Sequence, residues 1–272
     1  MSLNQTLRDL HVKFADTDQR MPTLFVGHGS PMNAIEDNDF SRAWAQVGKS
    51  LPKPNAILCV SAHWETAGTF VTGMDQPKTI HDFGGFPPEL YEMEYPAPGS
   101  PDLAQLTTET VHKAPVRFDQ SWGLDHGTWS VLCRMFPNAD IPVIQLSLDR
   151  TQSPQFHYEL GRELLALRNK GVLIVGSGNI VHNLRTITFQ DKAFDWAIEF
   201  DQTVKRLIED GNHNSIIGYQ NLGQAARLAI PTNEHYLPLL YILALQDERE
   251  QVHFFADRVT LGSVSMRSVL IR

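Results

Sequence analysis

The chain has 272 residues, which is enough for one or two domains of ordinary size. Lysine and arginine number 23 against 31 aspartate and glutamate residues, so the formal net charge is −8, and the chain lacks the basic surface by which proteins bind nucleic acid. Hydrophobic residues make up 42% of the chain and charged residues 20%, a composition that excludes disorder over most of its length.

The cysteine content and the chain start narrow the class of protein further. Cys59 and Cys133 are too few for a disulfide framework or for a cysteine-rich zinc or iron–sulfur site. Residues 1–20 are charged throughout and are not a signal peptide, and the longest apolar stretch, residues 237–245, is too short to span a bilayer. We therefore expect a cytoplasmic protein without a membrane partner.

The first half of the chain predicts mainly strands. In chain order, apolar runs bounded by glycine or proline occupy residues 22–26, 56–60 and 142–148, and residues 69–72 form a shorter candidate strand. Continuous apolar runs of this length are typical of strands that helices cover on both faces.

The second half alternates helices with strands. Residues 153–170 have the clearest helix signals, with Ser153 as N-cap, Pro154 in the first turn and Gly171 after the end. A buried strand follows at residues 172–175, then helices at residues 194–209 and 234–246.

The tail and the overall order of elements indicate the fold. Residues 252–259 and 263–271 alternate in the manner of a hairpin at a sheet edge. The strand–helix order predicts an α/β fold, a single domain with a mostly parallel central sheet covered by helices on both faces. No change of composition marks a linker, so we expect an N-terminal arm over residues 1–20 and one domain over residues 21–272.

Histidines follow three of the predicted buried strands. His28 comes after the first strand, His63 after the second, and His182 after the strand at residues 172–175. The carboxyl ends of such strands border the ligand crevice of an open α/β sheet, and three imidazoles there suit a mononuclear metal site. His235, at the start of the helix at residues 234–246, is a fourth candidate ligand. For any one of these histidines alone, an ordinary structural role remains an equal alternative.

Seven short sequence motifs, in a fixed order, resemble those of a known family. The motifs are GHGSPMN (27–33), SAHW (61–64), HDFGGFP (81–87), YPAPGSP (95–101), GLDHGTW (123–129), GSGNIVHN (176–183) and EHYLPLLY (234–241). With them, the sequence from about Met21 to the C-terminus resembles the bacterial 4,5-DOPA extradiol dioxygenases. These enzymes are class III extradiol ring-cleaving dioxygenases of the protocatechuate 4,5-dioxygenase type.

This resemblance implies a metal site and two acid–base groups. One divalent metal ion, Fe(II) or Zn(II), would be held by His28, His63 and His235. His182 would be a fourth metal ligand or the catalytic base, and His126 would be a second catalytic acid–base group.

One position departs from the wider class, whose distant members complete the metal site with a glutamate. Here Glu234 and His235 are adjacent. A helix points neighbouring side chains about 100° apart, so we expect only one of the two to face the metal, and we favour His235.

The resemblance also implies the activity and the substrate class. The chain would be an oxidoreductase, an extradiol dioxygenase that adds both atoms of O2 to a catechol such as DOPA. Apart from the resemblance, two residues are candidates for binding the substrate: His81, which lies in an aromatic motif with paired glycines, and Arg185, three residues after His182. The ordinary alternatives are a packed turn for His81 and a salt bridge at the sheet rim for Arg185.

Two other functions fit the same histidines. One is a zinc-dependent hydrolase that activates water, and the other is a non-catalytic metal-binding scaffold. Oxygen consumption with a catechol and Fe(II) would separate the dioxygenase from both. The sequence leaves the oligomeric state open, a homo-oligomer included.

Overall fold

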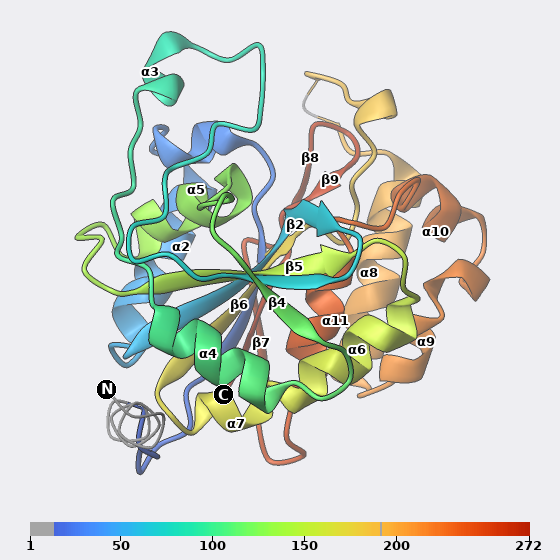
Figure 1. Ribbon diagram of the computed structural model, residues 1–272. Coiled ribbons are helices and arrows are strands. Elements are labelled where there is room, and N and C mark those ends of the chain that lie inside the picture. Colours follow the sequence, from blue (N-terminus) through green and yellow to red (C-terminus); the bar gives the residue numbers. More distant parts are fainter. Residues whose placement is uncertain (1–13, 191) are drawn as a thin grey trace, which may run out of the picture.

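A computed structural model describes residues 14–190 and 192–272, and most of their strands belong to one sheet (Figure 1). Its strands are β1 (Thr23–Gly27), β2 (Ala56–Thr66), β3 (Thr69–Thr72), β4 (Val116–Asp119), β5 (Val143–Asp149), β6 (Val172–Gly178), β7 (Val252–Phe255) and β10 (Ser268–Ile271). They lie in the order β4-β3-β5-β2-β6-β1-β10-β7. The pairs β4–β3, β5–β2, β2–β6 and β6–β1 are parallel, so the mostly parallel sheet predicted from the sequence is confirmed.

Helices cover both faces of this sheet, and Figure 1 shows α2 and α5 on one side of it and α6, α8 and α11 on the other. The helices are α2 (Asp39–Ser50), α3 (Pro88–Tyr91), α4 (Pro101–Thr110), α5 (His126–Met135), α6 (Pro154–Glu163), α7 (Leu165–Arg168), α8 (Asp195–Glu209), α9 (His213–Ile217), α10 (Gln224–Ala229) and α11 (Leu237–Leu243). Short 3-10 turns are η1 (Pro31–Ala34), η2 (Leu184–Thr186) and η3 (Tyr219–Asn221). None of the helices among the described residues is both long enough and apolar enough to cross a membrane.

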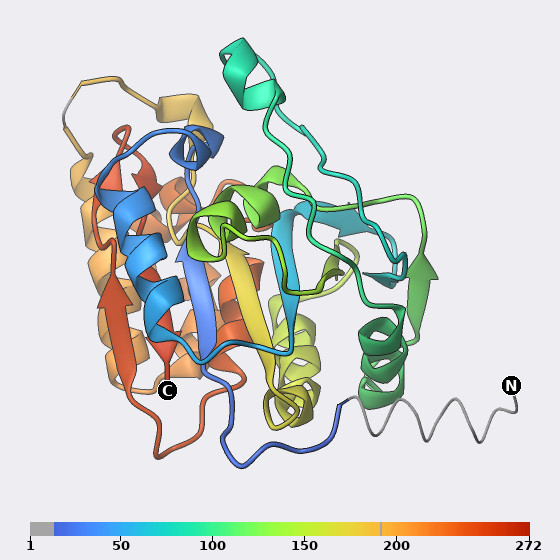
Figure 2. The same ribbon diagram turned by 90° about the vertical axis from the view of Figure 1, so that its left-hand side faces the viewer.

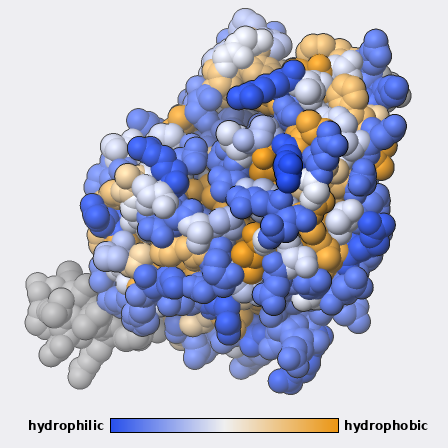
Figure 3. All heavy atoms as spheres, turned by 90° about the vertical axis from the view of Figure 1, so that its right-hand side faces the viewer, coloured by the Kyte–Doolittle hydropathy of each residue, from blue (hydrophilic) through white to orange (hydrophobic). Residues whose placement is uncertain are grey.

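The two faces of the sheet bury separate hydrophobic clusters. Along β1, Leu24 and Val26 join the cluster that contains Trp44 of α2, whereas Phe25 joins the cluster that contains Leu240 of α11. This alternation follows from the two-residue period of a strand. The outer faces of the helices are polar, and Figure 3 shows a mainly hydrophilic surface with small apolar areas on one side of the molecule.

Two of the predicted helices differ from the observed ones. Ser153 caps α6 by accepting from the backbone N–H of Phe156, as predicted. The single helix predicted over residues 153–170 is divided into α6 and α7, because Leu164 and Leu167 donate to carbonyls only three residues back. The helix predicted from residue 234 begins at Leu237, and Glu234 lies in the preceding turn.

Both ends of the described chain are bound to the rest of the fold. The predicted C-terminal hairpin is confirmed, since β7 pairs antiparallel with β10 at the sheet edge, and β8 (Val259–Thr260) and β9 (Val264–Ser265) form a small ribbon between them. Of the predicted N-terminal arm, residues 1–13 lie outside the described residues. Thr17, in the remaining part, donates its backbone N–H to the Asn169 carbonyl.

The strand order brings together the chain segments that end in histidines. Strand β6 lies between β2 and β1, and Ser177 of β6 is in register with Ser61 of β2 and Val26 of β1. In Figure 2 these three strands point toward the same end of the molecule, where α3 stands. The carboxyl ends of the strands, where the sequence predicts the ligand site, therefore lie at this end.

Candidate metal centre

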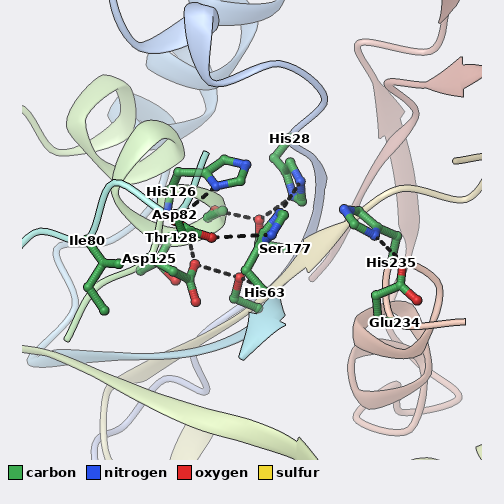
Figure 4. Close-up of polar contacts among 12 residues, drawn as sticks. His28, His63, Ile80, Asp82, Asp125, His126, Thr128, Ser177, Glu234 and His235 are labelled. Atoms are coloured by element: carbon green, nitrogen blue, oxygen red, sulfur yellow. Dashed lines mark hydrogen bonds and ion pairs between the residues drawn. The ribbon is translucent and has the colours of Figure 1, made fainter. Parts of the chain in front are cut away.

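Five histidine side chains gather at the carboxyl ends of β1, β2 and β6, and Figure 4 shows part of this cluster. His28 follows β1, His63 lies in β2, His126 begins α5, His182 follows β6, and His235 lies in the turn before α11. His28, His63 and His126 offer ligand atoms within 4.8 Å of one another, and so do His182, Glu234 and His235. Each group could hold a metal ion.

Local irregularities of the backbone bring His63 and His235 to this place. The register between β2 and β5 shifts between Val60 and Glu65, and such a bulge redirects the side chains within it. At the end of β6, a Cβ on Gly178 would lie 2.1 Å from the His235 carbonyl oxygen. Only glycine allows β6 to lie against the turn that carries His235, where Asn179 donates its N–H to that carbonyl.

Hydrogen bonds fix the imidazole tautomers of His28 and His235. Ser177 donates its hydroxyl to the Gly127 carbonyl at 2.5 Å, so at 3.0 Å it can only accept from Nδ1 of His28. The Glu234 carboxylate accepts from Nδ1 of His235 at 2.9 Å. In both rings the proton is on Nδ1, and Nε2 carries a lone pair.

The third ring, that of His63, faces His28, and each of these two rings directs its Nε2 atom toward the other. The two Nε2 atoms are 3.1 Å apart. Nδ1 of His63 lies 3.4 Å from a carboxylate oxygen of Asp82, so its proton also belongs on Nδ1. Two lone pairs at this distance repel each other unless a cation lies near them, and the donor set therefore fits a metal ion.

Burial keeps these imidazoles neutral, as metal ligands must be. It lowers the pKa of His28 and of His235 well below the ordinary histidine value, and the neighbouring histidines lower both further. Burial, followed by the proximity of His126, lowers the pKa of His63 to about 3. The pKa of His182 falls to about 4, again mainly through burial.

His126 and His182 occupy opposite sides of the cluster. The ring of His126 lies 3.9 Å from that of His63, and its Nδ1 is 3.0 Å from Asp82. The ring of His182 stacks on that of His235, with centroids 3.4 Å apart and planes inclined by 12°.

The two predicted substrate-binding residues lie outside this group of rings. His81 contacts Phe83, whose ring in turn meets that of His126, and Nε2 of His81 lies 2.9 Å from the Met93 carbonyl oxygen. Arg185 is exposed in η2, and its backbone N–H is bonded to Asn183.

Asp125 ties the start of α5 to the sheet, although the sequence analysis did not single it out. Its buried carboxylate accepts from the backbone of Thr128, from the Ser61 hydroxyl at 2.7 Å and from the Gln145 amide at 2.6 Å. It thereby fixes His126, the first residue of the helix. An aspartate just before a helix is a capping signal, but its bonds to two strands appear only in the fold.

Sequence reasoning also missed Asp82, Ser177 and Glu234 as partners of the histidines. Each lies in one of the seven sequence motifs, and Glu234 was considered only as an alternative to His235 for facing the metal. Their contacts cross between separate segments or depend on a turn, so residue spacing alone does not reveal them.

An α/β sheet with several neutral, largely buried imidazoles at its strand ends could hold a metal ion, as the sites of metal-dependent enzymes do. Residues 22–266 match the family model described as the catalytic LigB subunit of aromatic ring-opening dioxygenase, and the chain belongs to this family. Its members are oxidoreductases that open aromatic rings with O2. The predicted class of activity, an extradiol dioxygenase, is thereby confirmed.

Relatives with closely similar chains support this assignment. The 4,5-DOPA dioxygenase extradiol of Escherichia coli (strain K12) is 49% identical over 258 residues, which are 93% of this chain and 95% of that protein. The protein of the same name from Beta vulgaris is 40% identical over 259 residues, 92% of this chain and 96% of its own. A crystal structure of an uncharacterized protein from Escherichia coli K12 matches with a TM-score of 0.82 and 43% identity, covering 93% of this chain and 100% of that one.

Proposed function

We propose that this chain opens the ring of DOPA, or of a related catechol with a side chain, using one Fe(II) ion held by His28, His63 and His235. The observation that carries the proposal is that these three rings each direct Nδ1 to a partner, which leaves a lone pair on each Nε2, while their centroids lie 5.0–5.3 Å apart. The names of the relatives from Escherichia coli and Beta vulgaris support DOPA as the substrate.

The spacing of the rings supports this choice of ligands. An imidazole nitrogen binds a metal at about 2.1 Å, so the centroids of two ligand rings around a tetrahedral ion are about 5.2 Å apart. The observed separations are 5.0 Å for His28–His63, 5.3 Å for His28–His235 and 5.0 Å for His63–His235. His126 lies closer to His63 than this spacing, at 3.9 Å, and suits a different role.

The reaction itself favours iron over zinc. When bound, the ion supplies Lewis acidity toward the catechol oxygens and, if it is Fe(II), a redox couple that Zn(II) lacks. Overall, a ring carbon–carbon bond beside one hydroxyl-bearing carbon breaks, and both atoms of O2 enter the product, a muconic semialdehyde.

His182 and His126 are placed to move the catechol protons. A metal ion lies near the plane of an imidazole that binds it, so the stacked, nearly parallel planes of His182 and His235 disfavour both rings as ligands of one ion, although their ligand atoms lie within 4.8 Å of each other. We therefore assign His182 as the base, because burial keeps it neutral and able to accept a proton. His126 is the second acid–base group, and its Nδ1 lies 3.0 Å from the Asp82 carboxylate, which leaves Nε2 to exchange protons.

Aromatic side chains near His126 would receive the substrate ring. Phe83 lies edge-on to His126 with centroids 5.5 Å apart, and it also contacts Phe86 and Tyr91. Such edge-to-face contacts suit a flat apolar ring. His81 supports this loop through its contact with the Met93 carbonyl, and its contact with substrate stays a prediction.

The test of this function compares metals and catechols. The metal-free protein, reloaded anaerobically with Fe(II) or with Zn(II), is given DOPA in an oxygen-electrode cell. We expect the Fe(II) protein to consume one O2 per DOPA and to form a semialdehyde chromophore, whereas the Zn(II) protein consumes none. Failure of the Fe(II) protein to cleave any member of a catechol panel would overturn the proposal.

Arg185 is expected to bind the carboxylate of the substrate side chain. Its exposed guanidinium follows His182 by three residues, and the described part of the chain gives it no ion pair. Arg185→Ala should raise KM for DOPA roughly tenfold to hundredfold, the value of a hydrogen bond to a charged group. Steady-state kinetics with 4-methylcatechol, which has no carboxylate, are the control. An equal rise of KM for both substrates would contradict this role.

A further inference from the structure

We propose that Asp82 is a positioning residue that orients His63 and His126 together, and thereby joins the metal ligand to the acid–base group. The roles of the two histidines rest on the proposed function. One carboxylate meets both rings: Oδ1 lies 3.0 Å from Nδ1 of His126, and Oδ2 lies 3.4 Å from Nδ1 of His63.

The carboxylate is itself held in a defined orientation. Oδ1 accepts the backbone N–H of His126 at 2.8 Å, at the start of α5 (Figure 4). The next residue, Phe83, packs its ring against those of His126 and Trp129. Both contacts anchor the segment that carries Asp82 to α5, and its side chain remains only 17% exposed although it belongs to a surface loop.

The positions of the ring protons follow from the charge of Asp82. Neither contact has hydrogen-bond geometry, but a carboxylate this close to Nδ1 attracts an N–H and repels a lone pair, so we infer that both rings carry their lone pair on Nε2. For His63 this atom is the one that lies 3.1 Å from Nε2 of His28, within the candidate metal centre. For His126 it is the atom free to exchange a proton with the substrate.

His63 differs from the other two proposed ligands in the part of the fold that supplies the partner of its Nδ1 atom. Ser177, the partner of His28, lies in the central strand β6, and Glu234, the partner of His235, is the adjacent residue. The partner of His63 comes from a surface loop and is shared with a second histidine. The orientation of His63 and that of His126 therefore depend on the same side chain.

Asp82→Asn tests this role with almost no change of shape. The atom at the Oδ1 position must remain an acceptor, because it receives the His126 N–H. The amide nitrogen then takes the Oδ2 position and donates toward Nδ1 of His63, which moves the ring proton to Nε2. Glu89→Gln is the matched control. It removes the same charge from an exposed site on α3, in the same surface segment of the chain.

Two measurements on the metal-free protein at pH 7 read out the result. Histidine side-chain ¹⁵N shifts should show Nδ1–H at His63 in the wild type and in Glu89→Gln, and Nε2–H in Asp82→Asn, with His28 and His235 unchanged. Competition titration with Zn(II) should show affinity lower by about 10- to 100-fold in Asp82→Asn alone, the usual effect of losing such a partner.

The outcomes distinguish this inference from the proposed function. Wild-type protein with Nε2–H at His63, or Asp82→Asn with unchanged tautomer and Zn(II) affinity, would overturn the role of Asp82. The first of these observations needs no variant, so the inference stays testable even if the substitution impairs folding. Ring cleavage by the Fe(II)-loaded wild type would then leave the proposed function intact, and its absence would remove that function without changing the tautomer result.

Discussion

His235→Ala is expected to abolish ring cleavage and to remove the bound metal. The substitution deletes one of three proposed ligands, and two imidazoles alone hold a divalent ion weakly. The fold should persist, because the link of this turn to β6 is a hydrogen bond from Asn179 to the backbone carbonyl of residue 235, which alanine keeps. Metal analysis after dialysis against Fe(II) and turnover of DOPA are the two measurements.

His112→Ala provides the matched control, since His112 is an exposed histidine after α4. It should retain both metal and turnover at the wild-type level. A His235→Ala protein that still binds one equivalent of Fe(II) as tightly as the wild type would show that the ligand set is wrong.

His182→Ala is expected to lower turnover by roughly 10²–10⁴-fold, the usual contribution of general acid–base catalysis, while the metal content stays at the wild-type level. The reason is the stacked arrangement, in which His182 covers His235 without sharing a ring plane with it. Metal analysis and single-turnover rates should be measured on the same preparation.

The two readouts separate the roles that the sequence leaves open for His182. Loss of metal would identify it as a fourth ligand and would contradict the argument from the ring planes. Unchanged metal together with unchanged turnover would exclude both roles.

The central part of the fold could be predicted from the sequence because its strands are buried on both faces. The apolar runs that predict β1, β2, β5 and β6 contain few polar residues, and the strands occur close to the expected positions. Strand β4, with the sequence Val-Arg-Phe-Asp, lies at the edge of the sheet and is half exposed. It shows no apolar run, so the pattern that identifies central strands cannot detect it.

The candidate site could be predicted only in part. Histidines after buried strands point to one crevice, which is why His28, His63 and His182 could be grouped without a structure. We expected only one of Glu234 and His235 to face the metal because both were predicted to lie in a helix, and that helix begins later than predicted. In the observed turn, Glu234 accepts from His235 instead of competing with it. Asp82 shows no signal of its own, because its partners come from distant segments.

The position of β1 between β6 and β10 has a consequence for the order of events during synthesis. The strand that leads into His28 is made first, yet one of its neighbours is the last strand of the chain, and His235 also belongs to the final part. Pairings between such distant segments form slowly, because the entropy cost of closing long loops comes before any stabilising contact is made. If the proposed ligands are right, a growing chain would expose single histidines that bind metal weakly, and tight uptake would follow the pairing of β1 with β6 and the docking of the turn that carries His235. The ion would then stabilise the whole folded sheet against unfolding, since no smaller unit contains all its ligands.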